Sequence, residues 1–240
     1  MRRAVYAAAI AALAAGSLST ESFWKWRAPT ALAAPAARSG HPARCDERWS
    51  TTVFGLPAGS SKESFEAQAD GSVRARSLFE PNAAARAVGA PSLERLARAS
   101  VEGGLSWRQE WREKGGERTS SEWKSSSGGG FERLPLGAAR AGAHAEPFEG
   151  LNLDSALLPR AAMLGWIEPG RARRVRVFLA GERSAMAELT LDASGRALVA
   201  RSAEFEMAVE LGPGSRPLSM TIRAGQASTR SELVSGGCAP

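Results

Sequence analysis

Histidine and cysteine are scarce in this chain of 240 residues, which has two of each. One histidine, His41, lies near the N-terminus, and the other, His144, lies far from it in the sequence. No pair of His or Cys residues has the spacing of zinc ligands, which usually come in closely spaced pairs. The sequence therefore predicts no metal site and no cofactor.

The motifs of common nucleotide-binding and hydrolytic enzymes are missing as well: there is no P-loop, no G-x-G-x-x-G that opens a helix and no G-x-S-x-G elbow. Residues 121–124 (SEWK) match the S-x-x-K pattern of penicillin-recognising enzymes, but they fall in a predicted strand and lack the companion motifs. Glu204 and Glu206 share a predicted strand face, as a glycosidase pair or a solvated face would. These absences favour a non-enzymatic role.

Long apolar runs are absent too, because a membrane-spanning helix needs about 20 residues and the longest run here is shorter. That run, residues 4–15, follows Arg2 and Arg3, a combination typical of the h-region of a secretory signal peptide. We assign residues 1–33 to a signal peptide. This assignment predicts a periplasmic or secreted protein of a bacterial envelope.

The end of the signal segment can be placed in two ways. Residues 31–33 (ALA) satisfy the small-x-small rule of signal peptidase, and residues 17–19 (SLS) are a nearer alternative. If the segment stays uncleaved, residues 23–27 (FWKWR) supply the aromatic and basic side chains of an interfacial belt. In that case the chain contacts the membrane only through this segment.

The excess of positive charge is small once the signal segment is removed. Cleavage after Ala33 removes four cationic residues and one glutamate, so the formal net charge of +6 falls to +3. Proteins whose main partner is nucleic acid usually carry a stronger basic patch. The sequence therefore predicts no nucleic-acid partner.

The two cysteines, Cys45 and Cys238, lie near the two ends of the exported part of the chain. In an oxidising compartment an even pair most often forms a disulfide, and this is the pairing we predict. The alternative is that Cys45 is a nucleophile activated by His41 or His144, although no signature residues flank it.

The exported part divides into a disordered leader, residues 34–44, and one β-rich domain, residues 45–240. Within the domain, residues 63–69 and 72–79 alternate in polarity around Asp70-Gly71, a strong hairpin signal. A second predicted hairpin joins residues 105–112 to a strand that contains Trp123. Its tryptophans, Trp107 and Trp111 included, share one face and form either part of the core or a stacking platform.

Two short helices are expected within this β-rich pattern. Residues 91–100 (PSLERLARAS) have Leu93, Leu96 and Ala97 at helical spacing behind a possible N-cap at Ser92. Residues 154–163 are the second helical candidate, while residues 80–90 are expected to be irregular.

The last third of the chain predicts an antiparallel meander with one buried face. In residues 171–179 (RARRVRVFL), the valines alternate with Arg174 and Arg176, which we place on the wet face opposite Glu188, Glu204 or Glu206. Arg171 and Arg173, at the entry to the strand, are then left to bind an anion or to be solvated.

Arg201 interrupts an otherwise apolar series, residues 197–211, in which every second residue is expected to face the core. If the alternation is unbroken, Arg201 points inward and needs an acid, carbonyl oxygens or an anionic head group. It would then anchor an internal ligand between Trp107, Trp111 and Phe205. The alternative is a bulge near Ser202 that turns Arg201 outward, or an inward acid that pairs with it.

Residues 153–170 (LDSALLPRAAMLGWIEPG), 174–197 (RVRVFLAGERSAMAELTLDASGRA) and 216–225 (RPLSMTIRAG) together resemble the C-terminal half of a family of exported bacterial β-proteins of unknown function. The resemblance covers roughly the last 90 residues. It implies an envelope protein with a curved, barrel-like sheet and carries over no catalytic residue.

The expected fold is mainly β: an antiparallel meander forming a strongly curved or barrel-like sheet, with one or two short helices. The function we expect is non-enzymatic, namely binding or carrying a lipid or other amphiphile, or scaffolding other envelope proteins. A hydrolase acting on envelope polymers is the first alternative, and a polyanion-binding module is the second.

Overall fold

The computed structural model describes residues 44–67, 73–90, 92–99, 105–112, 118–125, 131–136, 144–145, 151–178 and 184–239. Side chains are described for residues 44–67, 73–90, 92–97, 153, 155–177 and 184–238. The predicted signal peptide, the leader up to residue 43 and the turns at Asp70-Gly71 and Gly115-Gly116 lie outside the described residues.

The described residues form fifteen strands of one sheet. The first eight are β1 (Arg44–Val53), β2 (Leu56–Ala67), β3 (Val73–Pro81), β4 (Ser92–Ala99), β5 (Leu105–Arg112), β6 (Arg118–Ser125), β7 (Phe131–Leu136) and β8 (His144–Ala145). The others are β9 (Leu151–Asp154), β10 (Ala172–Phe178), β11 (Ser184–Leu191), β12 (Ala197–Arg201), β13 (Glu206–Leu211), β14 (Pro217–Ala224) and β15 (Ala227–Ala239).

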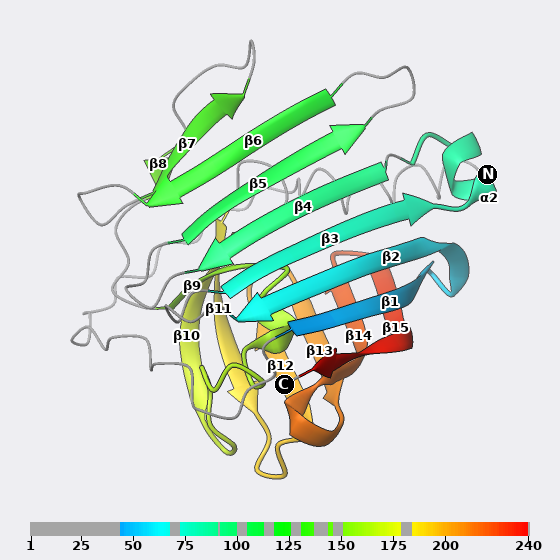
Figure 1. Cartoon of the computed structure of the whole chain (residues 1–240). Helices are drawn as coiled ribbons and strands as arrows, with labels where there is room; N and C mark the ends of the chain where they lie inside the picture. Colours follow the sequence, from blue (N-terminus) through cyan, green and yellow to red (C-terminus); the bar gives the residue numbers. More distant parts are fainter. Residues whose placement is uncertain are drawn as a thin grey trace.

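Two meanders meet at the pairing of β1 with β15, which we call the seam. The sheet order runs from β8 to β1 and then from β15 back to β9, so the first strand of the domain lies beside the last. All neighbours are antiparallel except β9 and β10, which run parallel. Figure 1 shows the sheet curling strongly, and β9 at one edge also lies close to β5. The predicted mainly β, curved, barrel-like architecture is confirmed.

Alternation of apolar and polar residues explains why these segments form strands. Along β1, Cys45, Glu47, Trp49, Thr51 and Val53 are buried, while the residues between them are exposed or half-buried. The strand β11 shows the same period of two. Such alternation is typical of a sheet with one face on the core and the other in water. We call these the interior and the outer face.

The interior is filled by the chain between β9 and β10. Residues 155–167, which we call the plug, include the 3-10 helix η1 (Leu158–Arg160), with Pro159 in its first turn. Figure 1 shows the sheet curling around this yellow-green segment, and η1 packs against β14. The buried apolar residues of the plug are Leu157, Leu158, Ala161, Ala162, Met163, Leu164, Trp166 and Ile167.

The plug is compact because its backbone groups bond locally. The amide of Leu164 donates to the carbonyl of Arg160 at 2.9 Å, and the amide of Trp166 donates to that of Ala161, also at 2.9 Å. Between them Gly165 has a φ of +68°, a left-handed conformation in which glycine carries no steric penalty. The turn therefore returns Trp166 and Ile167 to the interior.

The predicted helix over residues 91–100 is wrong, because this segment is strand β4. Leu93 and Ala97 lie four residues apart, a spacing that fits a helix face and a strand face equally well. The pairing of β4 with both β3 and β5 decides between the two, since each neighbour supplies a full set of backbone partners. Leu96, expected on the helix face, lies on the outer face and is 40% exposed.

The other helix predictions are also corrected. Residues 154–163 contain one turn of 3-10 helix instead of an α-helix. Residues 80–90, expected to be irregular, contain the short helix α2 (Ala83–Ala87). The side chain of Asn82 caps it by accepting a hydrogen bond of 2.8 Å from the amide of Ala85.

The series from 197 to 211 is not one strand but the hairpin β12–β13. Its turn is closed by Ser202, whose hydroxyl oxygen accepts hydrogen bonds from the amides of Glu204 and Phe205. Within β12 the buried residues are Leu198 and Ala200, so the expected inward face was displaced by one residue there. Arg201 therefore lies on the outer face.

Within the described residues, no helix is both long and apolar enough to cross a bilayer.

A disulfide joins Cys45 to Cys238 across the seam, as the sequence predicted. The bridge closes a loop of 193 residues, which in the chain-entropy model stabilises the fold by about 5 kcal/mol. We expect the double variant Cys45→Ser, Cys238→Ser to lose a comparable amount of unfolding free energy in urea. Thiol labelling of the unreduced, denatured protein should find no thiol, and two labelled cysteines would refute the bridge.

Candidate functional site

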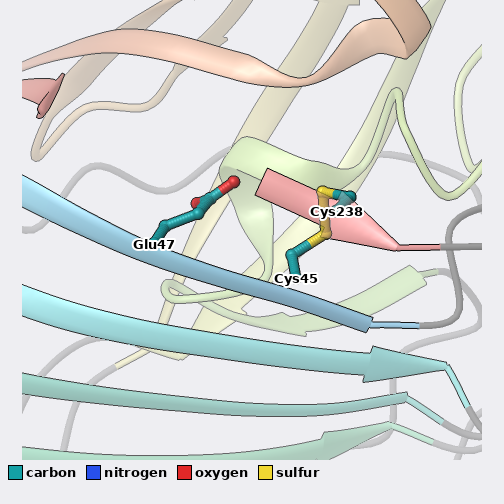
Figure 2. A group of neighbouring side chains, drawn as sticks. All are labelled: Cys45, Glu47 and Cys238. Carbon is teal, nitrogen blue, oxygen red and sulfur yellow. A yellow bond between two sulfur atoms is a disulfide. The ribbon is translucent and has the colours of Figure 1, made fainter. Parts of the chain in front are cut away.

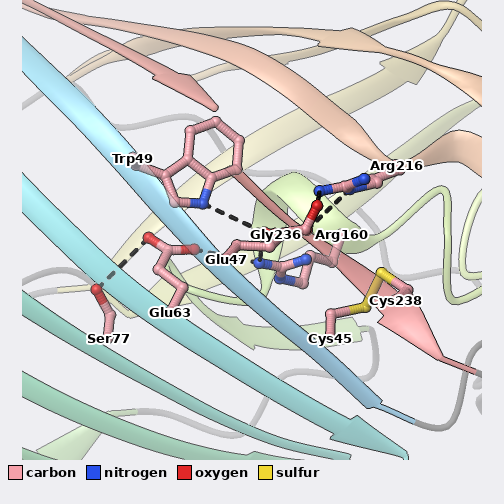
Figure 3. A network of polar contacts seen from close by, with 9 residues as sticks. All are labelled: Cys45, Glu47, Trp49, Glu63, Ser77, Arg160, Arg216, Gly236 and Cys238. Atoms are coloured by element: carbon pink, nitrogen blue, oxygen red, sulfur yellow. Dashed lines mark hydrogen bonds and ion pairs between the residues drawn. A yellow bond between two sulfur atoms is a disulfide. The ribbon is translucent and has the colours of Figure 1, made fainter. Parts of the chain in front are cut away.

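A buried polar cluster lies on the interior face beside the seam and centres on Glu47 of β1 (Figure 3). The side chain of Glu47 is 0% exposed. Its Oε2 accepts hydrogen bonds from Arg160 Nη2 at 2.7 Å and from Trp49 Nε1 at 3.2 Å, and its Oε1 accepts one from Arg216 Nε at 3.1 Å. Three donors on three different segments thus hold one carboxylate.

Arg160 brings the plug into this cluster, with its side chain only 3% exposed. Its Nη2 also lies 3.2 Å from Glu63 Oε2, and its guanidinium carbon lies 5.3 Å from the centre of the Phe65 ring. Its Nη1 is buried without a hydrogen-bond partner among the described residues. The arginine is therefore paired with two carboxylates and an aromatic face, all from β1 and β2.

Arg216, which precedes β14, connects the cluster to the C-terminal strand. Its Nη2 donates to the carbonyl of Gly236 at 2.8 Å. Gly236 lies opposite Glu47 with a φ of +110°, and a Cβ there would come within 2.1 Å of the carbonyl oxygen of Asp46. Only glycine fits this close approach. Glu47 is thus bonded to Arg160 of the plug and, through Arg216, is connected to Gly236 at the seam.

Burial and neighbouring charges shift the pKa values of two members of the cluster, Glu63 and Arg160. Burial raises the pKa of Glu63, an effect to which Glu47 adds and which Arg160 opposes. Burial by itself lowers the pKa of Arg160, but the carboxylates of Glu63 and Glu47 outweigh it and leave the pKa raised. Arg160 therefore stays charged, and Glu63 takes up a proton at a higher pH than an ordinary glutamate does.

The polar cluster is one end of a row that crosses the interior face. The register places Glu47, Glu63, Ser77 and Arg95 side by side on β1 to β4, and it continues to positions 109 and 121. Ser77 Oγ lies 3.5 Å from Glu63 Oε1, and Arg95 Nη1 donates to Ser155 Oγ of the plug at 2.6 Å. This polar row contacts the plug at two points, Ser155 and Arg160.

The cluster has neither the chemistry of a metal centre nor that of a hydrolase. Ligand atoms of Cys45, Glu47 and Cys238 lie within 4.8 Å of one another (Figure 2), but both sulfurs are used by the disulfide and Glu47 is held by three donors. Glu47 and Glu63 lie directly opposite each other, yet Arg160 bridges them and Glu47 is inaccessible to a substrate. The arrangement is suited to holding structure in place.

The predicted anchor is not assembled. Arg201 is 67% exposed and lies 3.6 Å from Glu206, on the outer face of the β12–β13 hairpin. Phe205 is half-buried and packs against the core from the hairpin turn. Trp107 and Trp111 lie on β5, in the other meander, and their side chains lie outside the described residues. Arg201 thus does not point into the interior that the other three were expected to line.

The arginines of β10 follow the prediction in part. Arg174 is exposed and lies opposite Glu188, as expected. Arg176 is instead buried, at 8% exposure, although it lies two residues from Arg174 on the same strand. Arg173 donates to the carbonyl of Trp166 at 2.8 Å, and burial lowers its pKa, while Arg171 stays exposed.

The cluster residues were missed by the sequence prediction, although β1 carries a signal for one of them. Glu47 lies between Cys45 and Trp49 in an alternation whose other members are uncharged, so its position requires an interior charge. Arg160 carries no such signal, because the plug has no period. Its burial depends on the sheet curling around it.

No family model and no curated protein sequence matches this chain. Its fold is similar to that of a β-barrel-like protein from Brucella abortus that belongs to the domain of unknown function DUF1849. The two share 12% sequence identity at a TM-score of 0.57, over 82% of this chain and 98% of the other. The likeness shows the fold alone, and it is consistent with the resemblance to bacterial β-proteins of unknown function.

Replacing Arg160 by Met tests whether the cluster holds the plug. The variant leaves the buried Glu47 and the half-buried Glu63 without their shared cation, and breaking a buried ion pair in this way costs about 3–5 kcal/mol. The matched control is Arg74→Met on the exposed outer face, which should cost less than about 1 kcal/mol. Equal losses in urea unfolding would contradict the role of Arg160.

The raised pKa of Glu63 predicts a pH dependence of stability. The folded state binds this proton more tightly than the unfolded chain does, so the stability it contributes is fully present below the ordinary value of 4.5 and is lost as pH rises through the raised pKa. Glu63→Gln stays neutral and should therefore gain stability relative to the parent as pH rises. Glu66→Gln, exposed on the same strand, should not. The measurement is the free energy of unfolding in urea at several pH values for the parent and both variants. If this free energy changes with pH in the same way for the parent and Glu63→Gln, the prediction is wrong.

Proposed function

We propose that this chain is an exported, non-enzymatic envelope protein that binds an amphipathic molecule on the interior face of β4–β6. The observation that carries the proposal is the division of the interior into two parts. The plug packs into one core with buried residues of β1–β4 and β10–β13, whereas β5–β8 extend beyond it (Figure 1). A ligand would therefore lie against the extended part.

Apolar residues occur at the interior positions that lead to this part. Ala75 and Ala97 face the interior, and the register continues their row to positions 107 and 123, both tryptophan. Leu93 lies between Phe79 and position 111, a third tryptophan. Rows of aromatic and aliphatic residues, here on either side of the polar row, are typical of a surface that binds acyl chains or ring systems.

The polar row supplies the complementary feature between these apolar rows. Arg95 lies on β4 in the row that begins with Glu47, at the border between the plug and the extended part of the sheet. A guanidinium there is suited to the anionic head group of an amphiphile. In this proposal Arg95 takes the role that the sequence prediction gave to Arg201.

Export is the second part of the proposal. The disulfide between Cys45 and Cys238 is compatible with an oxidising compartment, and the signal-like segment over residues 1–33 supports passage into a bacterial envelope. A hydrolase is supported less well, because the paired carboxylates of Glu47 and Glu63 are held by Arg160.

A matched pair of variants on β4 tests the binding face. Leu93→Ser changes the interior face and Leu96→Ser changes the outer face of the same strand, and neither leucine is fully buried. The probe is cis-parinaric acid, a fluorescent fatty acid excited by energy transfer from tryptophan. Loss of one leucine contact is worth about 1.5–3 kcal/mol, so Leu93→Ser should weaken binding about tenfold or more.

The control should bind as the parent does, with a dissociation constant unchanged within error. If Leu96→Ser weakens binding as much as Leu93→Ser, the ligand does not use the interior face. If the folded parent binds neither cis-parinaric acid nor any lipid detectable by native mass spectrometry, the proposed function is wrong.

A further inference from the structure

We propose that the outer face of β1–β3 binds an acidic polysaccharide, a linear polyanion, independently of the interior face. The site is a group of five cationic side chains, which we call the basic face: Arg44, Arg48, Lys62, Arg74 and Arg76. It lies on the side of the sheet opposite the plug, so it is separate from the site of the proposed function.

The strand alternation places these side chains outside. On β3, Val73 and Ala75 are buried, whereas Arg74 and Arg76 are exposed. On β1, Arg44 and Arg48 alternate with the buried Cys45 and Glu47 in the same way. The basic face is therefore a direct consequence of the pattern that builds the core.

Two adjoining hollows lie on this face. One, of about 420 Å³, includes Arg44, Glu66, Arg74, Arg76 and Leu96 in its lining. The other, of about 360 Å³, is lined in part by Asp46, Arg48, Lys62, Arg76 and Leu78. Both hollows include Ser64 and Arg76, so together they form one shallow trough that crosses several strands.

The cations of the trough are only partly neutralised. Arg44 pairs with Asp46 at 2.9 Å and Arg76 with Glu94 at 2.6 Å. Arg48, Lys62 and Arg74 have no ion pair with another described residue.

Arg48 also lies directly opposite Lys62 on the neighbouring strand. Like charges directly opposite each other destabilise a sheet, and an anion bound between them removes that repulsion.

The arrangement favours a linear anion over a single small one. Neighbouring strands are about 4.8 Å apart. Arg48 and Lys62 lie in one row across β1 and β2, and Arg76 of β3 lies in the next row, so these three cations follow a diagonal across the strands. A chain that carries an acidic group on successive units can contact several of them at once. Arginine binds carboxylate and phosphate groups through two parallel hydrogen bonds. Leu78 and Leu96 give the trough apolar walls suited to the carbon faces of sugar rings.

Two double variants that remove equal charge test the proposal. Arg48→Gln with Lys62→Gln changes the basic face, whereas Arg174→Gln with Arg201→Gln removes two exposed cations from β10 and β12. The probe is a polygalacturonate oligomer, a chain of uronic acids, titrated at several salt concentrations. The first double variant should weaken binding about tenfold or more, with a shallower salt dependence. The control should change affinity less than about threefold by the same measure.

Stability shows whether the basic-face variant is folded. Because it removes a like-charge pair, it should melt at the same temperature as the parent or higher without ligand. The proposal is overturned if both double variants lose affinity equally, because binding then follows net charge alone. It is also overturned if the parent does not bind the oligomer. If the parent then binds phosphatidylglycerol vesicles instead, the basic face is a membrane surface.

Discussion

The ion pair between Glu47 and Arg160 is the interaction on which the arrangement of this molecule depends. One partner lies on the first strand of the sheet and the other on the segment that fills the sheet's interior, and both are nearly inaccessible to water. Taking two charges out of water is costly, and the cost is met here by additional partners: Trp49, Arg216 and Glu63. Arg216 extends the same network to Gly236, and the nearby disulfide covalently closes the seam. We infer that this buried pair contributes specificity of plug placement more than net stability.

Filling of the interior has a functional consequence. A curved sheet can hold a ligand inside its curl only where its own chain leaves room, and the plug occupies the part lined by buried residues of β1–β4 and β10–β13. In the proposed function the ligand lies on the interior face of β4–β6, with Leu93 and Arg95 at the border of the plug. The outer face of the same strands is basic, because the alternation that buries Val73 and Ala75 exposes Arg74 and Arg76. One strand pattern thus produces two chemically different surfaces.

Alternation predicted the fold class and most strands, because a period of two is visible wherever one face is buried. The disulfide was predicted separately, from an even pair of cysteines behind a signal-like segment. Alternation failed where another constraint decided the outcome. Residues 91–100 fit a helix as well as a strand until β3 and β5 supply hydrogen bonds. Arg201 changed face because Ser202 closes a turn that divides the expected strand in two. The cluster residue Arg160 was unpredictable from local sequence, since its burial depends on a sheet whose strands come from both halves of the chain.

Hydrogen exchange with and without cis-parinaric acid tests most directly whether the plug is permanent structure and the ligand lies beyond it. The backbone amides of residues 157–167 are expected to exchange slowly in both states, since they are buried and locally bonded. The amides of β4 are expected to slow further when the ligand is bound. The opposite result, in which the ligand changes exchange only in residues 157–167, would mean that the plug moves aside to admit it, and it would contradict this account.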